Sequence, residues 1–165
     1  MPSTPRITPC LWFDSEAEEA ANFYVGIFKN SKITQISRYG EAGKEQHRRP
    51  ASSVMTVAFE LDGQSFTALN GGPVFKFNEA VSLQVNCETQ EEVDFYWEAL
   101  GAGGDPKARQ CGWLKDKFGL SWQVVPGALV ELITGPDKAG AQRAMTAMMG
   151  MKKLDIAELK RAYAG

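Results

Sequence analysis

The 165-residue sequence predicts an α+β fold made of two similar βαβββ modules followed by a helical tail. Two internal matches carry this prediction. Residues 11–28 match residues 83–100 at an offset of 72, and the match includes an identical Phe-Tyr pair. Residues 63–66 match residues 119–122 at an offset of 56. Because the two matches occur in the same order, we interpret them as an internal repeat, with about 16 extra residues in the first copy.

The first module has a local signal for each of its elements. Ser15 and Glu18 form the pattern of a capping box, which marks the start of a helix. Residues 41–53 are polar, lack periodicity and contain a proline, so they predict a loop. Asp62-Gly63 between two apolar runs predicts a hairpin turn. The expected elements are a helix that runs to about Phe28 and strands over residues 7–13, 33–39, 54–61 and 65–69.

The second module repeats this order, and a tail follows it. Thr89 with Glu92 predicts the start of its helix, and Phe118-Gly119 predicts its hairpin turn. Asp155 with Glu158 predicts the start of the last tail helix. The expected strands cover residues 81–87, 107–109 (weakly marked), 113–115 and 120–125, and the expected helices cover residues 90–100, 138–149 and 156–163. We therefore expect one domain over residues 1–165, with module one at about 5–70, module two at about 80–126 and the tail at 127–165.

Composition narrows the class of protein. A net charge of −2 gives no electrostatic reason to expect a nucleic acid or an anionic membrane as a partner. No apolar run approaches the roughly 18 residues that a membrane span requires. The three cysteines, Cys10, Cys87 and Cys111, form no CxxC motif and cannot all pair. We expect a cytoplasmic protein with reduced thiols.

Several motifs resemble one protein family. They are Ile7-Thr8-Pro9 with Leu11-Trp12-Phe13-Asp14, Asn22-Phe23-Tyr24, Gly112-Trp113 with Asp116, Gly119–Pro126, and the tail segment Met151–Ile156. Together they are similar to the PhnB-like branch of the vicinal oxygen chelate superfamily, which includes glyoxalase I and bleomycin-resistance proteins. The resemblance implies curved mixed sheets around a cup, C-terminal helices and a homodimer. PhnB-like proteins often carry the label 3-demethylubiquinone-9 3-methyltransferase.

Strand alternation indicates which residues face the cup. Val81, Leu83 and Val85 are apolar and are expected to pack under the helix, so the residues between them face the other way. The repeat carries this assignment to the first module and to the hairpin strands. The predicted ligand-binding residues are Thr8, Cys10, Trp12, Thr67, Leu69, Ser82, Gln84 and Gln123. No catalytic residue is assigned.

The resemblance implies a divalent metal held by His and Glu, sometimes Gln, yet this set contains no histidine and no carboxylate. Gln123 stands at the position of the family's usual glutamate, and the only histidine, His47, lies in the polar loop. Cys10 with Gln84 and Gln123 is a weak substitute set, because an amide is a poor metal ligand. We therefore predict no metal and no cofactor. Gly101–Gly104 follows a helix rather than a strand, so it predicts a helix-ending turn and gives no support to the methyltransferase label.

The leading functional hypothesis is a small-molecule binding protein, or a metal-independent enzyme, that uses a polar cup. One alternative is a metal-dependent lyase, isomerase or dioxygenase in which His47 folds into the cup. Another is a drug-sequestering resistance protein that binds without turnover. Trp113 and Trp122 are expected in the wall or core, where a cup-facing ring could stack on a planar ligand. Asp116 and Glu60 are expected to be solvated charges.

Overall fold

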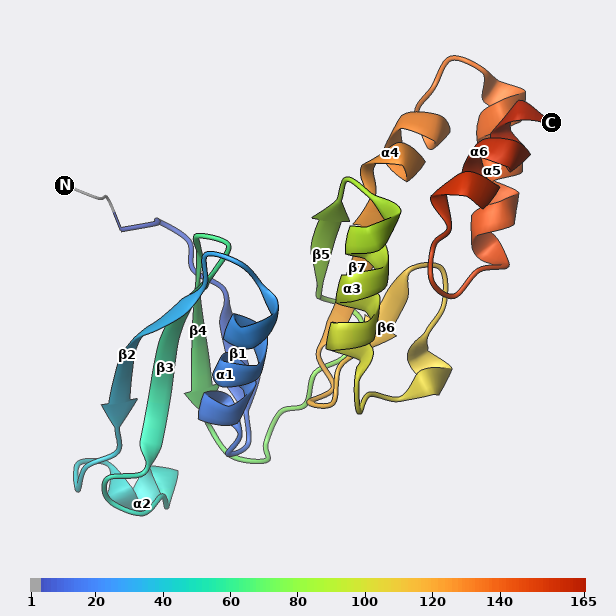
Figure 1. Cartoon of the computed structure of the whole chain (residues 1–165). Helices are drawn as coiled ribbons and strands as arrows, with labels where there is room; N and C mark the ends of the chain where they lie inside the picture. Colours follow the sequence, from blue (N-terminus) through green and yellow to red (C-terminus); the bar gives the residue numbers. More distant parts are fainter. Residues whose placement is uncertain (1–3) are drawn as a thin grey trace. The chain divides into compact units, whose positions relative to one another are not determined.

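The computed structural model describes residues 4–165, which form two compact units that divide between Phe77 and Asn78 (Figure 1). Each unit has a mixed sheet with a helix on one face, which confirms the α+β class and the paired modules. The helical tail belongs to the second unit. None of the helices over residues 4–165 combines the length and apolar character that crossing a bilayer demands.

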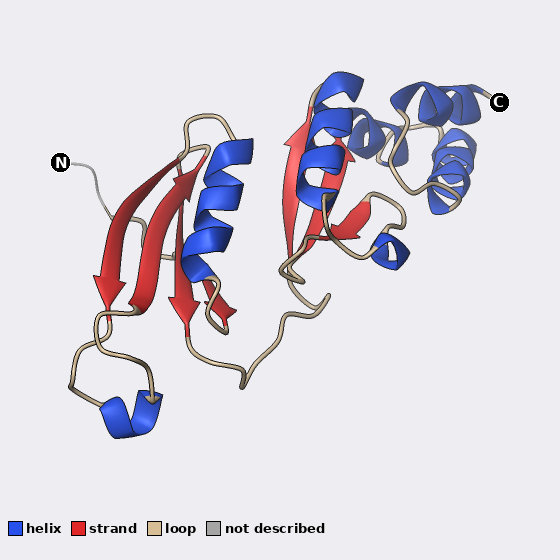
Figure 2. Ribbon diagram, turned by 60° about the horizontal axis from the view of Figure 1, so that its bottom comes forward, coloured by secondary structure: helices blue, strands red, loops and turns tan. Residues whose placement is uncertain are grey.

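The first unit is a complete βαβββ module. Its sheet has the strand order β1-β4-β3-β2, in which β1 is parallel to β4 and the other pairs are antiparallel (Figure 2). A short helix, α2, lies inside the loop that the sequence predicted. The elements are β1 (Cys10–Phe13), α1 (Ala17–Ile27), β2 (Lys32–Arg38), α2 (Lys44–His47), β3 (Val54–Leu61) and β4 (Gln64–Asn70).

The core of this unit lies between α1 and one face of the sheet. Tyr24 of α1 is fully buried, and its ring lies 6.4 Å from the ring of Phe59 on β3. Phe59 in turn stacks on Phe66 of β4 at 5.5 Å. Because side chains alternate along a strand, burial of this face leaves the opposite face of the sheet uncovered by α1. That second face is where the sequence places the candidate site.

The predicted capping box at the start of α1 is wrong. The N-cap is Glu16, and no side chain within the pattern caps the helix. Instead, the amide N–H of Ala17 donates to Oδ1 of Asn70, at the end of β4, over 2.8 Å. Asn70 is buried and can supply this acceptor because the chain brings it there from 53 residues away. A long-range partner thus replaces the local one.

The second unit has one strand fewer than the first. Its sheet has the order β5-β7-β6, with β5 parallel to β7 and β6 antiparallel to it. Helix α3 packs on one face of this sheet, and the tail helices follow β7 (Figure 2). The elements are β5 (Ser82–Cys87), α3 (Gln90–Gly101), β6 (Trp113–Lys115), β7 (Ser121–Pro126), α4 (Gly127–Ile133), α5 (Lys138–Met149) and α6 (Ile156–Ala164).

The strand predicted at residues 107–109 is wrong, because a 3-10 turn over Pro106–Ala108 takes its place. The side chain of Asp105 accepts from the backbone N–H of Lys107 at 2.9 Å, and Pro106 stands at the first position of the turn. An Asp-Pro pair favours a turn over a strand, since the carboxylate bonds the following backbone and proline fixes φ. The second module is therefore βαββ.

The tail packs on the second unit through a small core and through polar contacts with α3. Leu129, Leu154 and Leu159 form the core, and α5 and α6 pack against each other. Gln90 of α3 donates to the carbonyl of Leu154 at 3.0 Å and accepts from the N–H of Ile156 at 2.8 Å. The sequence missed α4, because it starts directly after Pro126 without a polar capping residue.

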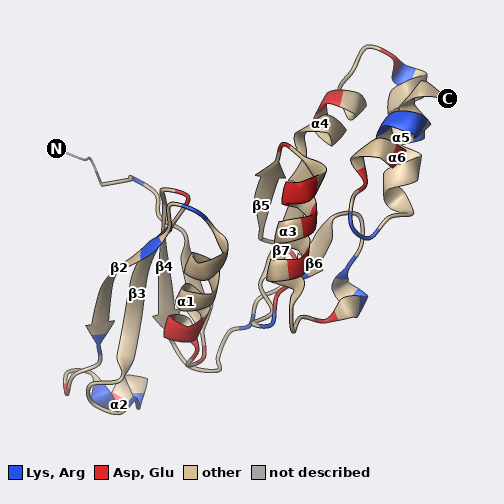
Figure 3. Cartoon of the chain, viewed as in Figure 1, with Lys and Arg blue, Asp and Glu red and all other residues tan. Residues whose placement is uncertain are grey.

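Two of the predicted helix starts in this unit are confirmed. The Thr89 hydroxyl accepts from the N–H of Glu92 at 3.2 Å, and Asp155 accepts from the N–H of Glu158 at 2.9 Å. Acidic residues gather on α3 (Figure 3). One of them, Asp94, pairs with Lys153 at 2.9 Å, and a hydrogen bond from Gln90, reinforced by one from Lys153, lowers the pKa of this carboxyl. These contacts help to anchor the tail on α3.

Candidate functional site

The sheet faces that lie opposite α1 and α3 carry the predicted site residues. We call them the open face of each sheet. In the first unit Cys10 and Trp12 of β1 alternate with residues buried under α1, and Thr67 and Leu69 of β4 do the same. The register pairs Cys10 with Thr67 and Trp12 with Leu69, so the four lie in two adjacent rows. Thr8 precedes β1 and is exposed.

Trp12 is held rigidly on the first open face. Its indole N–H donates to the carbonyl of Gly72 at 2.9 Å, and the Phe75 ring meets it edge-on at 4.9 Å. A Cβ at Gly71 would stand 2.2 Å from the Trp12 ring, so only glycine allows this close approach. The wall that Trp12 forms is therefore preorganised.

The second open face carries a row of neutral polar side chains. The register sets Gln84 of β5 beside Gln123 of β7. The Gln123 amide donates to the Ser82 hydroxyl at 3.0 Å, and the Gln84 amide donates to Asn86 at 2.9 Å. The sequence predicted Ser82, Gln84 and Gln123 on one face, and the structure brings them together. Their role in binding stays a prediction.

The two tryptophans of the second hairpin lie on opposite faces. Trp122 is buried on the α3 side, whereas Trp113 is half-buried on the open face and is paired in register with Gln123. Trp113 is thus the aromatic neighbour of the polar row. The sequence left both residues as wall or core, because the phase of a three-residue strand such as β6 is hard to read from pattern alone.

Ser121, like Trp113, belongs to the second sheet and is absent from the predicted ligand-binding residues. It lies on β7 between Ser82 of β5 and Lys115 of β6, and it is only 1% exposed. Its hydroxyl has no hydrogen-bond partner among residues 4–165. Lys115 forms an ion pair with Glu79, so its ammonium group is already neutralised. A buried hydroxyl without a partner is unusual in a folded protein.

Asp116 is buried, which makes the expectation of a solvated charge wrong. It is 2% exposed, and one carboxylate oxygen accepts from the N–H groups of Phe118 and Leu120 at 2.8 and 3.1 Å. The other oxygen accepts from the indole N–H of Trp122 at 2.9 Å. The carboxylate therefore closes the β6–β7 turn and orients Trp122. Its repeat mate Glu60 is partly exposed beside Lys32, as expected of a solvated charge.

The residues present do not fit the metal centre that the superfamily implies. Among residues 4–165, no three His, Cys, Asp or Glu side chains are grouped so as to hold a metal ion. His47 uses Nδ1 to accept from the N–H of Arg49 at 2.9 Å, and its ring lies against Tyr39 at 4.4 Å. Its Nε2 is buried. The histidine is thus built into its own loop, and we derive no chemistry through a metal.

Neither Cys10 nor Cys87 is an activated nucleophile. Partial desolvation raises the pKa of the Cys10 thiol, although the residue is exposed. Cys87 is 2% exposed on the α3 face of β5, and burial, reinforced by the charge of Glu92, raises its pKa to about 11. Both shifts favour the neutral thiol, which is the unreactive form.

Because of the raised pKa of the Cys87 thiol, we expect the folded protein to lose stability at alkaline pH. Its pKa rises from 9.0 to about 11 on folding, so the folded state keeps a proton that the unfolded state releases. Stability is therefore full below pH 9 and falls by about 2–3 kcal/mol as the pH rises through 11. Urea unfolding at pH 8, 9, 10 and 11 measures this fall. The Cys87→Ala variant is the control, and an equal fall in that variant would contradict the assignment to Cys87.

The first unit also contains a small cavity away from its open face. It has a volume of about 190 Å³ and lies where β4 ends and β3 begins, beside the first turn of α1. Its lining residues are Ser15, Glu18, Arg49, Pro50, Ser53, Val54 and Asn70. No pattern in the sequence indicated this cavity, because its lining residues come from three separate segments.

Comparisons with known proteins place the chain in a family. The family model described as 3-demethylubiquinone-9 3-methyltransferase matches residues 5–125. The chain is 38% identical to a protein from Bacillus cereus described as a putative 3-demethylubiquinone-9 3-methyltransferase, PhnB protein. That match covers 74% of this chain and 100% of the other, with a TM-score of 0.63. The chain therefore belongs to this family, which confirms the resemblance to the PhnB-like branch of the vicinal oxygen chelate superfamily.

More distant similarity supports the fold alone. Protein PA1353 from Pseudomonas aeruginosa is 20% identical, and the match covers 74% of this chain and 98% of the other with a TM-score of 0.56. No curated protein matches the chain significantly. The family match ends at residue 125, before α4, so the resemblance noted within the tail stays a prediction.

Proposed function

We propose that the protein binds a small, neutral, planar organic molecule on the open face of its second sheet. The observation that carries this proposal is the row of Ser82, Gln84 and Gln123 beside the half-buried Trp113. Amide groups both donate and accept hydrogen bonds, so they suit carbonyl and hydroxyl groups of a ligand. An indole ring offers a flat apolar surface for stacking.

The charge of this row supports a neutral ligand. None of the three polar residues ionises, and Lys115 on the neighbouring strand is paired with Glu79. A carboxylate or a phosphate bound here would lose its hydration without gaining an unpaired cation, which is costly. A neutral amide, ketone or phenol pays a smaller desolvation penalty and recovers it through hydrogen bonds to the amide side chains.

The family description names a methyl transfer, which we do not propose for this chain. Nucleotide-type cofactors are often bound where a glycine-rich loop leads from a strand into a helix. In this chain Gly101–Gly104 ends α3, and the N–H of Gly104 closes the turn on the carbonyl of Gly101 at 3.0 Å. The three glycines of this segment therefore build a helix-ending turn, as the sequence predicted. The expected homodimer and the open-face site of the first unit stay predictions.

Titration with benzamide tests the proposal, with calorimetry or ligand-observed NMR as the measurement. Benzamide carries one flat ring and one amide, and we expect it to bind more tightly than benzoate, which is charged. Replacement of the central amide in Gln123→Ala is expected to weaken benzamide binding about tenfold, through the loss of one or two hydrogen bonds and of a preorganised surface. Trp113→Leu is expected to weaken it by a similar factor.

The control variant is Gln142→Ala, which removes an exposed glutamine from α5 in the same unit. It should leave benzamide affinity unchanged, and urea unfolding should show that all three variants remain folded. Undetectable benzamide binding, or equal affinity in Gln123→Ala and the parent chain, would overturn the proposal. Binding of S-adenosylmethionine to the parent chain would instead favour the methyl-transfer activity.

A further inference from the structure

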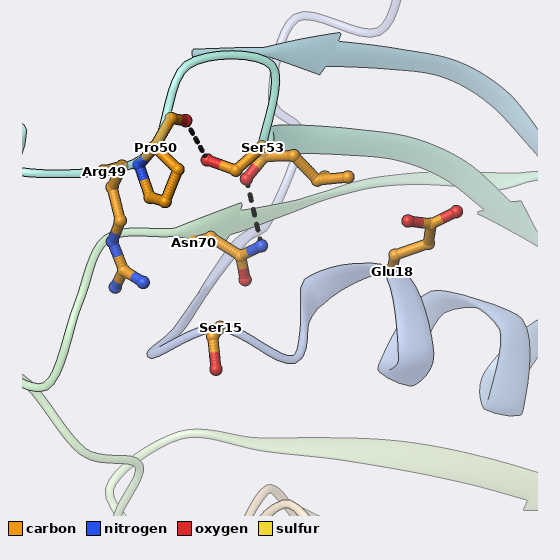
Figure 4. A pocket seen from close by; sticks show the side chains of 7 residues that line it. Ser15, Glu18, Arg49, Pro50, Ser53 and Asn70 are labelled. Atoms are coloured by element: carbon orange, nitrogen blue, oxygen red, sulfur yellow. Dashed lines mark hydrogen bonds between the residues drawn. The ribbon is translucent and has the colours of Figure 1, made fainter.

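The cavity beside the first turn of α1 is a second candidate site, independent of the proposed function above. It opens on the α1 side of the first sheet, because Asn70 follows Phe66 and Ala68 in the row that α1 covers. Figure 4 shows Asn70 and Ser53 at its centre, with Arg49 on one side and Glu18 on the other. The open-face residues named above belong to the opposite side of the sheet.

The frame of this cavity is held by hydrogen bonds. The Asn70 side chain accepts from the N–H of Ala17 at 2.8 Å and donates to the carbonyl of Val54 at 3.1 Å. It thereby ties α1 to the start of β3. The Ser53 hydroxyl donates to the carbonyl of Pro50 at 2.7 Å, which holds the loop on the other side of the cavity. A site with a fixed frame loses little entropy when it binds a ligand.

Both charged residues of the cavity have side-chain atoms that can still form hydrogen bonds with a ligand. The Arg49 side chain is 20% exposed, and its Nη2 donates to the backbone carbonyl and the carboxylate of Asp14 at 2.6 and 3.0 Å. Among the described residues, Arg49 Nε and Nη1 have no such partner. The half-buried Glu18 carboxylate likewise forms no hydrogen bond or ion pair within residues 4–165.

Volume and lining restrict the ligand. About 190 Å³ is below the roughly 300–1,000 Å³ of pockets for drug-sized molecules. It equals the liquid volume of about six waters, at about 30 Å³ each. Pro50 and Val54 add apolar surface between the two charged side chains. A molecule of amino-acid size with opposite charges at its two ends matches this lining.

We propose that this cavity binds a small zwitterion whose carboxylate and primary ammonium groups are joined by a short aliphatic chain. The carboxylate accepts from the free donors of Arg49, whose Asp14 partner keeps the guanidinium in place. The ammonium group donates to Glu18. The unpaired Glu18 carboxylate then offsets the ammonium charge, and the ligand carboxylate gains directed hydrogen bonds from a guanidinium whose charge is shared with Asp14, so both ends of the ligand are needed.

Titration of the full chain with γ-aminobutyrate tests this proposal, with backbone amide NMR as the measurement. We expect shifts at the amides of residues 15–18, 49, 51–54 and 70. Butyrate and butylamine each lack one of the two charges, and each is expected to bind about tenfold more weakly than γ-aminobutyrate. Equal affinity for all three compounds, or shifts confined to other residues, would overturn the proposal.

A variant pair isolates the role of Glu18. Glu18→Gln is expected to weaken γ-aminobutyrate binding about tenfold and to leave butyrate binding unchanged. The matched control is Glu91→Gln, because Glu91 occupies the second position of α3 as Glu18 does in α1 and lies outside the cavity. An equal loss in both variants would show a general charge effect and would contradict the proposal. Titration of the same variants with benzamide tests the open-face site separately, so that failure of one proposal can be distinguished from failure of the other.

Discussion

The Asp116→Ala variant is expected to lose about 3–5 kcal/mol of unfolding free energy, measured by urea denaturation at pH 7. The change removes the acceptor of three donors, namely the N–H groups of Phe118 and Leu120 and the indole N–H of Trp122. The donors from Leu120 and Trp122 are buried and have no route to water without local unfolding. Unpaired buried donors of this kind are among the most destabilising changes in a core.

Two further variants separate the parts of this network. Glu60→Ala removes the repeat mate of Asp116, a partly exposed carboxylate with a 4.0 Å ion pair to Lys32, and is expected to cost less than about 1 kcal/mol. Trp122→Phe removes one donor and leaves the carboxylate with the other two, so it should cost less than Asp116→Ala. If Asp116→Ala were as mild as Glu60→Ala, the carboxylate would not hold the turn.

Gly104→Ala is expected to destabilise the second unit by about 3 kcal/mol, because no space exists for the added methyl group. A Cβ at this position would stand 2.1 Å from the backbone carbonyl oxygen of Lys115 on β6. That neighbour is backbone, so relief requires movement of the turn after α3 or of the strand itself. Thermal or urea unfolding measures the effect.

Gly26→Ala is the matched control, since Gly26 lies inside α1 and a Cβ there would meet nothing within 4 Å. Alanine is favoured over glycine in a helix, so this variant is expected to gain about 0.5–1 kcal/mol. Opposite signs for the two substitutions would show that the glycine-rich turn serves close packing between α3 and β6. A neutral Gly104→Ala would contradict this explanation and reopen the question of a ligand-binding role for the turn.

The repeat and the local signals predicted most of the fold because they report short-range physics. The hairpin at Asp62-Gly63 and the helix starts at Thr89 and Asp155 are confirmed, since each depends on residues within a few positions of one another. Strand alternation also placed Gln84 and Gln123 correctly on one face. The errors arose where a weak local pattern was judged from the repeat alone, as at residues 107–109, where an Asp-Pro turn replaces the expected strand.

The sequence by itself determined the family, the two modules and the absence of histidine and carboxylate from the predicted site positions. Only the tertiary structure decided which polar groups are buried and what they contact. Asp116 looks like a solvated charge in sequence, yet the β6–β7 turn closes around it. Asn70 caps α1 from the end of β4, and the cavity between Glu18 and Arg49 exists only because three segments meet there. Alternation and capping are local, whereas burial depends on which distant segments the fold brings together.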